Sequence, residues 1–357
     1  MRGYTEIEQI VKRWGITMRA TRLRNLILLV YGILHSRSGN LSAIVRHWPY
    51  GPRRHTHRLK RLHRFLKNPG VQVERYFQIL AAVIWPYRPG GERTPLYPVI
   101  LDWTKVHDLH VLFAAVPHKK RALPLAYGVY HPIRLRKSQN VLERGMLTLV
   151  ASLLPQHTRL VVLADAGFGQ TELIRWLQAR KIEYVIRLRA ETLVHYHGKT
   201  MPVGSLNTLE GAPLLFSQVD YRDKLPVRLK LVVSRKGDQV WYLGTSFTDA
   251  EQTVEWYKKR FWIEEMFRDL KTHLGLTQAH LKHEDRLARL LLGFQIAYLI
   301  LALIGLHLPS RWQTYLASRN RLSFPQLALW ALIWLRIPVH RKVWQHSVFP
   351  AFSLESG

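Results

Sequence analysis

The order of apolar segments between residues 97 and 189 limits the fold of this chain more than any other feature of its sequence. Short apolar runs typical of buried strands alternate there with segments whose apolar residues recur at helical spacing. This alternation predicts an α/β layer. The expected strands cover residues 98–102, 109–116, 123–129, 159–164 and 183–189, and the expected helices cover residues 138–154 and 170–180.

Three strands, a helix, a strand, a helix and a strand is the order of a ribonuclease-H-like core, which we place at residues 96–189. The alternation then stops. Two short apolar runs, 227–233 and 240–244, lie among Gly and Pro turns and predict a β-rich insertion over residues 190–247.

One long helix is expected next, within residues 248–282. Thr248 is followed three residues later by Glu251, which is the spacing of a capping box with Thr as the N-cap. Gly275 is the expected helix stop. The helix therefore covers residues 251–275.

The beginning of the chain is strongly basic. Residues 1–95 contain 18 Lys and Arg against four acids, within a chain of formal net charge +29. This excess predicts a polyanionic partner, with nucleic acid favoured over an anionic membrane surface. Residues 53–66 combine helical apolar spacing with many basic residues, so we expect an amphipathic helix with a basic outer face. We interpret residues 1–95 as a helical, basic DNA-binding domain, which ends in a Pro- and Gly-rich linker at residues 86–95.

The end of the chain, residues 283–357, is predicted to be a helical C-terminal region. Its apolar run at residues 290–308 is nearly long enough to span a bilayer, but polar residues interrupt it. We therefore favour a buried helix and expect no membrane partner, and a basic membrane-associated protein is the alternative. Three tryptophans at helical spacing are expected to be core residues: Trp330, Trp334 and Trp344.

Two aspartates are expected at the ends of buried strands. Asp102 follows the apolar run 98–101, and Asp165 follows the apolar run 161–164. Carboxylates on neighbouring strand ends suit a hard divalent cation. A strand-end Asp is also a common turn or N-cap residue, so each alone is weak evidence.

The long helix presents a polar stripe. Tyr257, Arg260, Glu264 and Lys271 fall within an arc of roughly 60° at about 100° per residue. The alternative is an exposed helix face on which Arg260 and Glu264 form an ordinary i,i+4 pair.

Phosphodiester cleavage by two metal ions needs residues of these types. Carboxylates hold two Mg²⁺ ions, for which Mn²⁺ is expected to substitute, and basic side chains hold the scissile strand. The chain contains no cysteine, which excludes disulfides, Cys-ligated metal sites and thiol catalysis.

At these residues the sequence resembles the DDE transposases of bacterial insertion sequences, in the insertion-sequence-four (IS-four) family. The spacing from Tyr257 through Arg260 and Glu264 to Lys271 matches the YREK signature of that family. Leu101 to Thr104 is similar to its first aspartate motif, and Asp165 to Phe168 to its second, although Arg is common where Ala166 stands. The resemblance covers roughly residues 20–305.

The resemblance implies roles for these residues. Asp102, Asp165 and Glu264 would be the catalytic metal ligands, and Tyr257, Arg260 and Lys271 would bind DNA at the transposon end. A flipped base near a DNA hairpin would stack on an aromatic side chain. The candidates for that contact are Trp241, Phe261 and Trp262.

The implied activity is cut-and-paste DNA transposition by hydrolysis and strand transfer. The implied partners are double-stranded DNA, as terminal inverted repeats and target DNA, and a second copy of the chain in a synaptic dimer. The expected location is the cytoplasm, at the bacterial nucleoid. Two other functions stay open: a ribonuclease-H-fold DNA nuclease without strand transfer, and an inactive transposase-derived DNA-binding protein.

Overall fold

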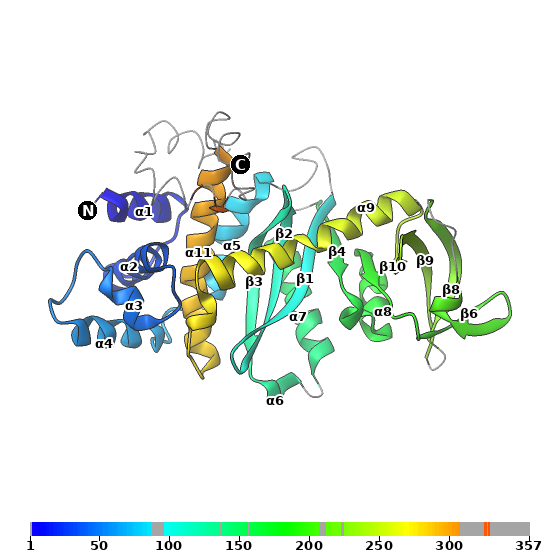
Figure 1. Ribbon diagram of the computed structural model, residues 1–357, viewed down its shortest axis with the longest axis horizontal. Helices are drawn as coiled ribbons and strands as arrows, with labels where there is room; N and C mark the ends of the chain where they lie inside the picture. Colours follow the sequence, from blue (N-terminus) through cyan, green and yellow to red (C-terminus); the bar gives the residue numbers. More distant parts are fainter. Residues whose placement is uncertain are drawn as a thin grey trace. The chain divides into compact units, whose positions relative to one another are not determined.

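The computed structural model describes residues 2–87, 96–135, 138–155, 157–206, 212–222, 225–307, 325–326 and 328 (Figure 1). The chain divides into two compact units, each built from separate segments. Unit 1 consists of Met1–Pro86, Lys105–Leu109 and Met266–Gly357, and unit 2 consists of Tyr87–Thr104 and His110–Glu265. The domain boundaries expected from the sequence at residues 95, 189, 247 and 282 divide the chain differently, and they stay predictions.

Ten strands form one mixed sheet in the order β3-β2-β1-β4-β5-β10-β9-β8-β6-β7. The pairs β1–β4 and β4–β5 are parallel, whereas β2–β3, β5–β10 and β9–β10 are antiparallel. This α/β arrangement with a large mixed sheet is consistent with the predicted ribonuclease-H-like core. The strands are β1 (Leu96–Val106), β2 (Leu109–His118), β3 (Arg121–Tyr130), β4 (Arg159–Ala164), β5 (Glu183–Arg187), β6 (Leu193–Tyr196), β7 (Lys199–Pro202), β8 (Leu214–Tyr221), β9 (Val227–Lys236) and β10 (Gln239–Thr245).

The region predicted as a β-rich insertion continues the same sheet. β10 pairs with β5 from Thr245↔Val185 to Leu243↔Arg187, so the added strands extend the edge of the parallel part. The sequence analysis found β9 and β10 but missed β6, β7 and β8. Those three are short or largely exposed and therefore lack the apolar runs by which buried strands are recognised.

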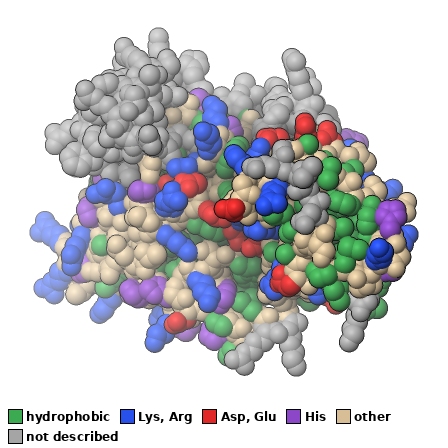
Figure 2. All heavy atoms as spheres, turned by 45° about the vertical axis from the view of Figure 1, so that its right-hand side comes forward, with side chains coloured by type: hydrophobic (Ala, Val, Ile, Leu, Met, Phe, Trp, Pro, Cys, Tyr) green, Lys and Arg blue, Asp and Glu red, His purple; other side chains and the backbone are tan. Residues whose placement is uncertain are grey.

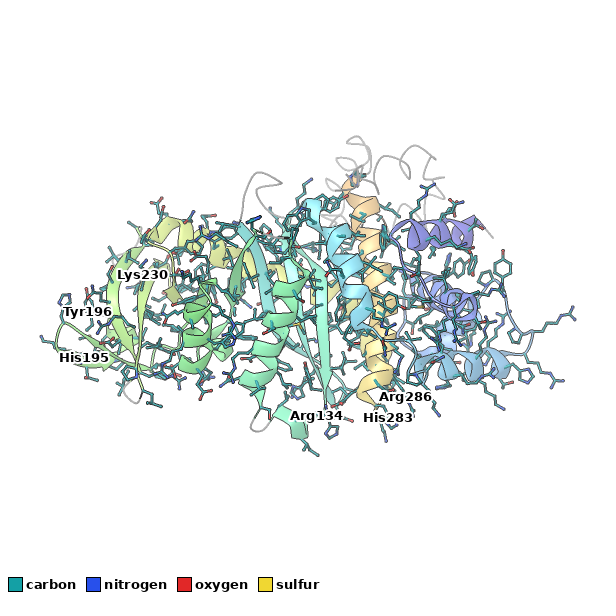
Figure 3. All side chains as sticks on the ribbon, turned by 180° about the vertical axis from the view of Figure 1, so that it is seen from behind. Arg134, His195, Tyr196, Lys230, His283 and Arg286 are labelled. Carbon is teal, nitrogen blue, oxygen red and sulfur yellow. The ribbon has the colours of Figure 1, made fainter. Side chains whose placement is uncertain are left out.

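Three helices pack on the sheet within unit 2. These are α7 (Gln139–Leu153), α8 (Thr171–Ala179) and α9 (Ala250–Arg260). α7 contacts β3, α8 contacts β5 and β9, and α9 contacts β4 and β5. Figures 1 and 3, which view the molecule from opposite sides, show α9 crossing one face of the sheet and α7 and α8 on the other. Both faces of the central strands are therefore covered, which agrees with their buried side chains.

The long helix predicted after the insertion is interrupted. Its N-cap is Asp249, whose carboxylate accepts a hydrogen bond from the backbone N–H of Gln252 at 3.0 Å, so the expectation of Thr248 was wrong by one residue. α9 ends at Arg260, α10 (Trp262–Arg268) follows, and a π-helix, η5 (Asp269–His273), replaces the last predicted turn. Gly275 stops the helical segment as predicted, at φ +70°, which favours glycine.

Unit 1 contains the basic N-terminal helices and an apolar helix, α11 (Glu284–His307). α11 packs against α2 and α4. Its length and apolar composition would allow it to cross a membrane, but 94% of its most apolar window is buried inside the protein. This confirms the expectation of a buried helix for the described part of residues 290–308. The N-terminal helices are α1 (Arg2–Arg13), α2 (Ala20–Ser36), α3 (Leu41–Arg46), α4 (His55–Leu66) and α5 (Glu74–Ile84).

Some expectations lie outside the described residues. They concern the linker beyond Tyr87, which includes Pro89 and Pro95, and the C-terminal tryptophans Trp330, Trp334 and Trp344. The shorter described elements are α6 (Pro132–Leu135), η1 (Trp85–Tyr87), η3 (Ala166–Phe168), η4 (Val203–Ser205) and η6 (Leu276–Gln278).

Candidate active site

The parallel register of β1 and β4 places two aspartates at neighbouring positions. The last pair in this ladder is Leu101↔Ala164, and Asp102 and Asp165 are the next residues on each strand. Parallel strands run in the same direction, so the residues after the last pair lie at the same end of both strands. The two carboxylates therefore lie at the same end of the paired segment. The expectation that Asp102 ends its strand was wrong, because β1 continues to Val106. β1 itself continues past Asp102, but its pairing with β4 ends at Leu101.

The environments of the two aspartates differ. The side chain of Asp102 is only 15% exposed. Burial raises the pKa of Asp102 to about 7, and the negative charges of Asp165 and Glu264 add to the rise. Asp165 caps the short helix η3, since its Oδ1 accepts a hydrogen bond from the backbone N–H of Gly167 at 2.9 Å. Asp165 is thus a cap residue as well as a neighbour of Asp102.

Arg260, at the end of α9, joins Asp102 to Glu264. Its Nη1 lies 3.8 Å from Asp102 Oδ2, and its Nη2 donates a hydrogen bond to Glu264 Oε1 at 2.5 Å. The Arg260 side chain is 8% exposed, whereas that of Glu264 is 52% exposed. The sequence left open that Arg260 and Glu264 form an i,i+4 pair, and this pair is present. The pair is not simply exposed to solvent, because Arg260 also faces Asp102. Neighbouring Glu265 pairs with Arg121, at 3.3 Å, whereas Glu264 joins this cluster through Arg260.

Tyr257 is buried beneath two other aromatic side chains. Its exposure is 0%. The Trp241 ring lies 5.1 Å from it and the Phe261 ring 5.7 Å, both in edge-to-face contact. Arg260 also lies over the Phe261 ring, at 4.2 Å. In this structure Tyr257 offers no surface to DNA, and it packs beneath Trp241 and Phe261.

Lys271 lies in the other compact unit. It belongs to η5, and its Nζ is 5.9 Å from the ring of Phe267. The turn at Phe261 and the π-helix change the angular spacing of the segment. The single stripe expected from an uninterrupted α-helix therefore does not hold as far as Lys271.

Glu143, on α7, is a buried acid that the sequence analysis missed. It is 0% exposed, and its Oε1 accepts hydrogen bonds of 2.9 Å from Trp103 Nε1 and from Gln139 Nε2. Burial raises its pKa, and these two hydrogen bonds oppose the rise. The available signal was its position one helical turn before Met146 and Leu147, on the apolar stripe of α7.

Glu143 and Arg260 contact successive residues of β1, and successive strand residues point to opposite faces of a sheet. Trp103 contacts Glu143 on the α7 side, and Asp102 contacts Arg260 on the α9 side. We therefore assign Glu143 to the support of Trp103, while the negative charge of Asp165 adds to the rise of the Glu143 pKa.

The comparison with known families adds independent evidence. Residues 128–300 match the family model of the transposase DDE domain. The match supports a DDE transposase. It includes Asp165 and Glu264 and begins after Asp102. No curated protein matches the sequence.

The carboxylates of a DDE transposase are expected to bind divalent metal ions, and their chemistry here fits that purpose. Asp102 and Asp165 offer only oxygen ligands, which Mg²⁺ prefers. A bound cation would also offset the negative charge of Asp165, which adds to the effect of burial in raising the Asp102 pKa. Among the residues that the structure describes, no group of three or more His, Asp or Glu side chains is already arranged to hold a metal ion. For Glu264 to become the third ligand, its side chain must exchange Arg260 for the metal.

Proposed function

We propose that this protein catalyses cut-and-paste DNA transposition, by metal-dependent hydrolysis and strand transfer at the ends of an insertion sequence. The observation that carries the proposal is the register of β1 and β4, which makes Asp102 and Asp165 neighbours beside the Arg260–Glu264 pair. The match to the transposase DDE domain supports it. The finer assignment, to the insertion-sequence-four family with the YREK signature, is part of the proposal.

Asp102, Asp165 and Glu264 would hold two Mg²⁺ ions, and Mn²⁺ would substitute for them. When bound, the metal pair would activate the attacking water or 3′-hydroxyl and stabilise the leaving oxygen. Arg260 compensates the charge of Asp102 and keeps Glu264 close to it. A deprotonated Asp102 is needed for metal binding, so its raised pKa makes that binding pH-dependent.

The roles that we propose for Arg260, Lys271 and Tyr257 in DNA binding depend on where each residue lies in the structure. Arg260 and Lys271 would contact phosphates near the transposon end. Tyr257 would act through its neighbours, as a positioning residue beneath Trp241 and Phe261. Trp241 is the aromatic side chain we propose for stacking on a flipped base, since it is partly exposed above Tyr257.

Residues 1–95 would bind the terminal inverted repeats, and two chains would join two ends in a synaptic dimer that captures target DNA. Lys and Arg side chains are spread widely over the face drawn in Figure 2. With a formal net charge of +29, the chain is suited to a polyanionic substrate.

The test uses a donor plasmid that carries the element with its native flanks. The wild-type protein should excise the element in Mg²⁺ and not in EDTA. Asp102→Ala, Asp165→Ala and Glu264→Ala should abolish cleavage while end binding is retained. Glu265→Ala is the matched control, because Glu265 pairs with Arg121 outside the cluster, and it should keep most activity.

Full cleavage by any of the three cluster variants would overturn the assignment of the active site. Cleavage without joined products would identify a nuclease that lacks strand transfer. DNA binding without any cut in Mg²⁺ or Mn²⁺ would identify an inactive DNA-binding relative.

A further inference from the structure

The basic residues of α4 divide into two groups. Arg58 and Arg61 point into unit 1, where Arg58 donates hydrogen bonds to the carbonyls of Pro52 at 2.7 Å and Trp48 at 2.9 Å, and Arg61 donates to Asn25 Oδ1 at 2.7 Å. These two arginines are structural. Three exposed basic residues of α4 and its C-cap Lys67 form a stripe at helical spacing, which we call the α4 stripe: His57, Lys60, Arg64 and Lys67.

A buried arginine joins the end of α4 to the start of α11. Arg289 donates hydrogen bonds to the carbonyls of Leu66, at 2.7 Å, and Val71, at 3.1 Å. Its Nη1 also contacts Asp285 Oδ2, at 2.5 Å. We call these contacts the Arg289 joint. The joint places Arg286, three residues before Arg289 in the sequence, beside the α4 stripe. It also pairs the Asp285 carboxylate with Arg289. Figure 3 shows Arg286 near His283 at the beginning of α11.

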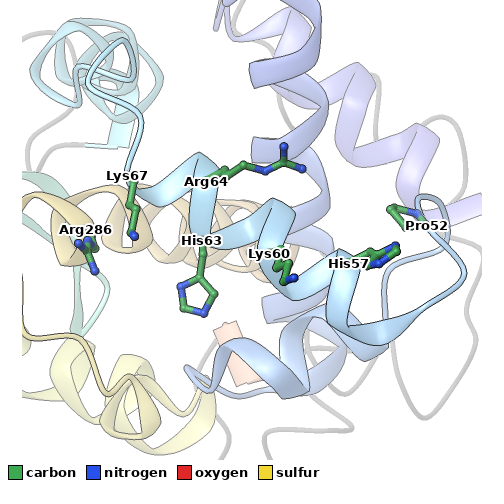
Figure 4. A pocket seen from close by; sticks show the side chains of 7 residues that line it. All are labelled: Pro52, His57, Lys60, His63, Arg64, Lys67 and Arg286. Carbon is green, nitrogen blue, oxygen red and sulfur yellow. The ribbon is translucent and has the colours of Figure 1, made fainter.

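The α4 stripe and Arg286 line a hollow of about 820 Å³. No acid lines it, and apart from Pro52 its lining consists of His57, Lys60, His63, Arg64, Lys67 and Arg286. Figure 4 shows Lys60, His63 and Lys67 along one side of α4, with Arg286 at the end of the row. Arg64 also lines a second hollow on this helix, of about 460 Å³, together with Arg61 and Arg22.

The lining determines what kind of ligand fits. Lys and Arg side chains bind phosphate groups, whereas base edges are read mainly by bidentate Arg, Asn or Gln in a groove of the duplex. This hollow contains no Asn or Gln and no acid to accept a hydrogen bond from cytosine. Its two arginines can bind phosphate or guanine, but its lysines are point charges that bind phosphate, so the lining as a whole favours the backbone of DNA over its bases.

We propose that this hollow is a docking site for the sugar–phosphate backbone of duplex DNA, and that it adds affinity without adding sequence specificity. The inference rests on the proposed function, since it supposes that DNA is the substrate. The site combines residues of the N-terminal helices with Arg286 at the start of α11. Arg286 follows the proposed catalytic helix in the sequence, so the DNA-binding surface would extend beyond residues 1–95.

The lowered pKa of His63 agrees with its position in a hollow lined by cations. Burial lowers the pKa of His63, and the positive charges of Lys67 and Arg286 lower it further. A phosphate in the hollow would offset those charges and raise the pKa. Two acids, Glu284 and Asp285, lie at the start of α11, and Asp285 is paired with Arg289.

The experiment compares two double variants with the same loss of charge. Lys60→Gln with Lys67→Gln removes two cations from the hollow. Lys181→Gln with Lys199→Gln removes two exposed cations from unit 2, outside residues 1–95 and outside the carboxylate cluster. Binding is measured against salt concentration on a duplex of the element end and on an unrelated duplex of equal length.

The hollow variant should bind both duplexes more weakly by the same factor, with the salt slope reduced by about 1 for each lost phosphate contact. The control should bind like the wild type. Arg286→Gln alone should reproduce about half of the change in slope. In the wild type, addition of either duplex should raise the pKa of His63 in an NMR titration.

Three results would overturn the proposal. One is wild-type affinity in the hollow variant, which leaves the proposed function intact if the protein still cuts DNA. Another is a loss confined to the element end, which would assign the hollow to sequence reading. The third is loss of binding to phosphatidylserine vesicles without any loss of DNA binding, which would assign it to a membrane surface. If the wild type binds neither duplex, the proposed function fails as well.

Discussion

At the scale of single residues, the ionisation of Asp102 carries the clearest energetic consequence. Its pKa is about 7 in the folded protein, against 3.8 for an ordinary aspartate. The folded state therefore holds a proton that the unfolded chain releases above pH 4. This contribution to stability is complete below about pH 4, declines as pH rises toward 7, and is lost above it.

We therefore expect the free energy of unfolding of the metal-free protein to fall between pH 4 and pH 7 by more than that of Asp102→Asn. The difference should not exceed about 4 kcal/mol, from about 1.4 kcal/mol per pKa unit. Denaturant unfolding in EDTA at several pH values measures it. Parallel pH curves for the two proteins would contradict the assignment of the raised pKa to Asp102.

Glu143 gives a second prediction at this scale. Glu143→Ala removes the acceptor for Trp103 and Gln139 and should lower the free energy of unfolding by about 1–3 kcal/mol. Glu143→Gln retains an acceptor oxygen and removes the buried charge, so it should cost less. Chemical denaturation at neutral pH compares them, and equal losses would show that the hydrogen bonds to Oε1 are not what matters.

At the scale of elements, the N-cap of α9 predicts different effects on stability for substitutions at two neighbouring residues, Thr248 and Asp249. Asp249→Ala should lower the free energy of unfolding by about 1 kcal/mol, because the Gln252 N–H loses its acceptor. Thr248→Ala is the matched control and should be close to neutral. Thermal or denaturant unfolding checks the pair, and the reverse ranking would restore the capping box that the sequence suggested.

The interruption of α9 also limits what periodicity can predict. Tyr257 and Arg260 lie on one α-helix, where their spacing is reliable. Glu264 lies beyond the turn at Phe261, and Lys271 lies in a π-helix. Hydrogen-bond shifts of this kind leave no apolar pattern behind, so sequence spacing alone cannot place all four on one face.

At the scale of the whole molecule, the formal net charge of +29 should determine how the protein behaves during purification and how strongly it binds nucleic acid. The purified protein is expected to retain host nucleic acid at low ionic strength and to release it at about 1 M salt, where charges are screened within about 3 Å. The ratio of absorbance at 260 and 280 nm before and after a high-salt wash measures this. A protein free of nucleic acid at low salt would contradict the expectation.

The sequence by itself determined the alternation of strands and helices, because buried apolar runs have a length and a period that survive without tertiary contacts. It also identified Asp102 and Asp165 as acids that follow such runs, and it predicted the basic face of α4. These inferences needed only local composition and spacing.

Only the tertiary structure decided how these parts combine. The register of β1 and β4 made the aspartates neighbours, packing placed Tyr257 under Trp241, and the Arg289 joint placed Arg286 beside α4. It also showed that the exposed strands β6, β7 and β8 extend the same sheet. The physical reason is common to all of them: strand pairing, burial of a polar side chain and contacts between distant helices depend on residues far apart in the chain, which no local pattern encodes.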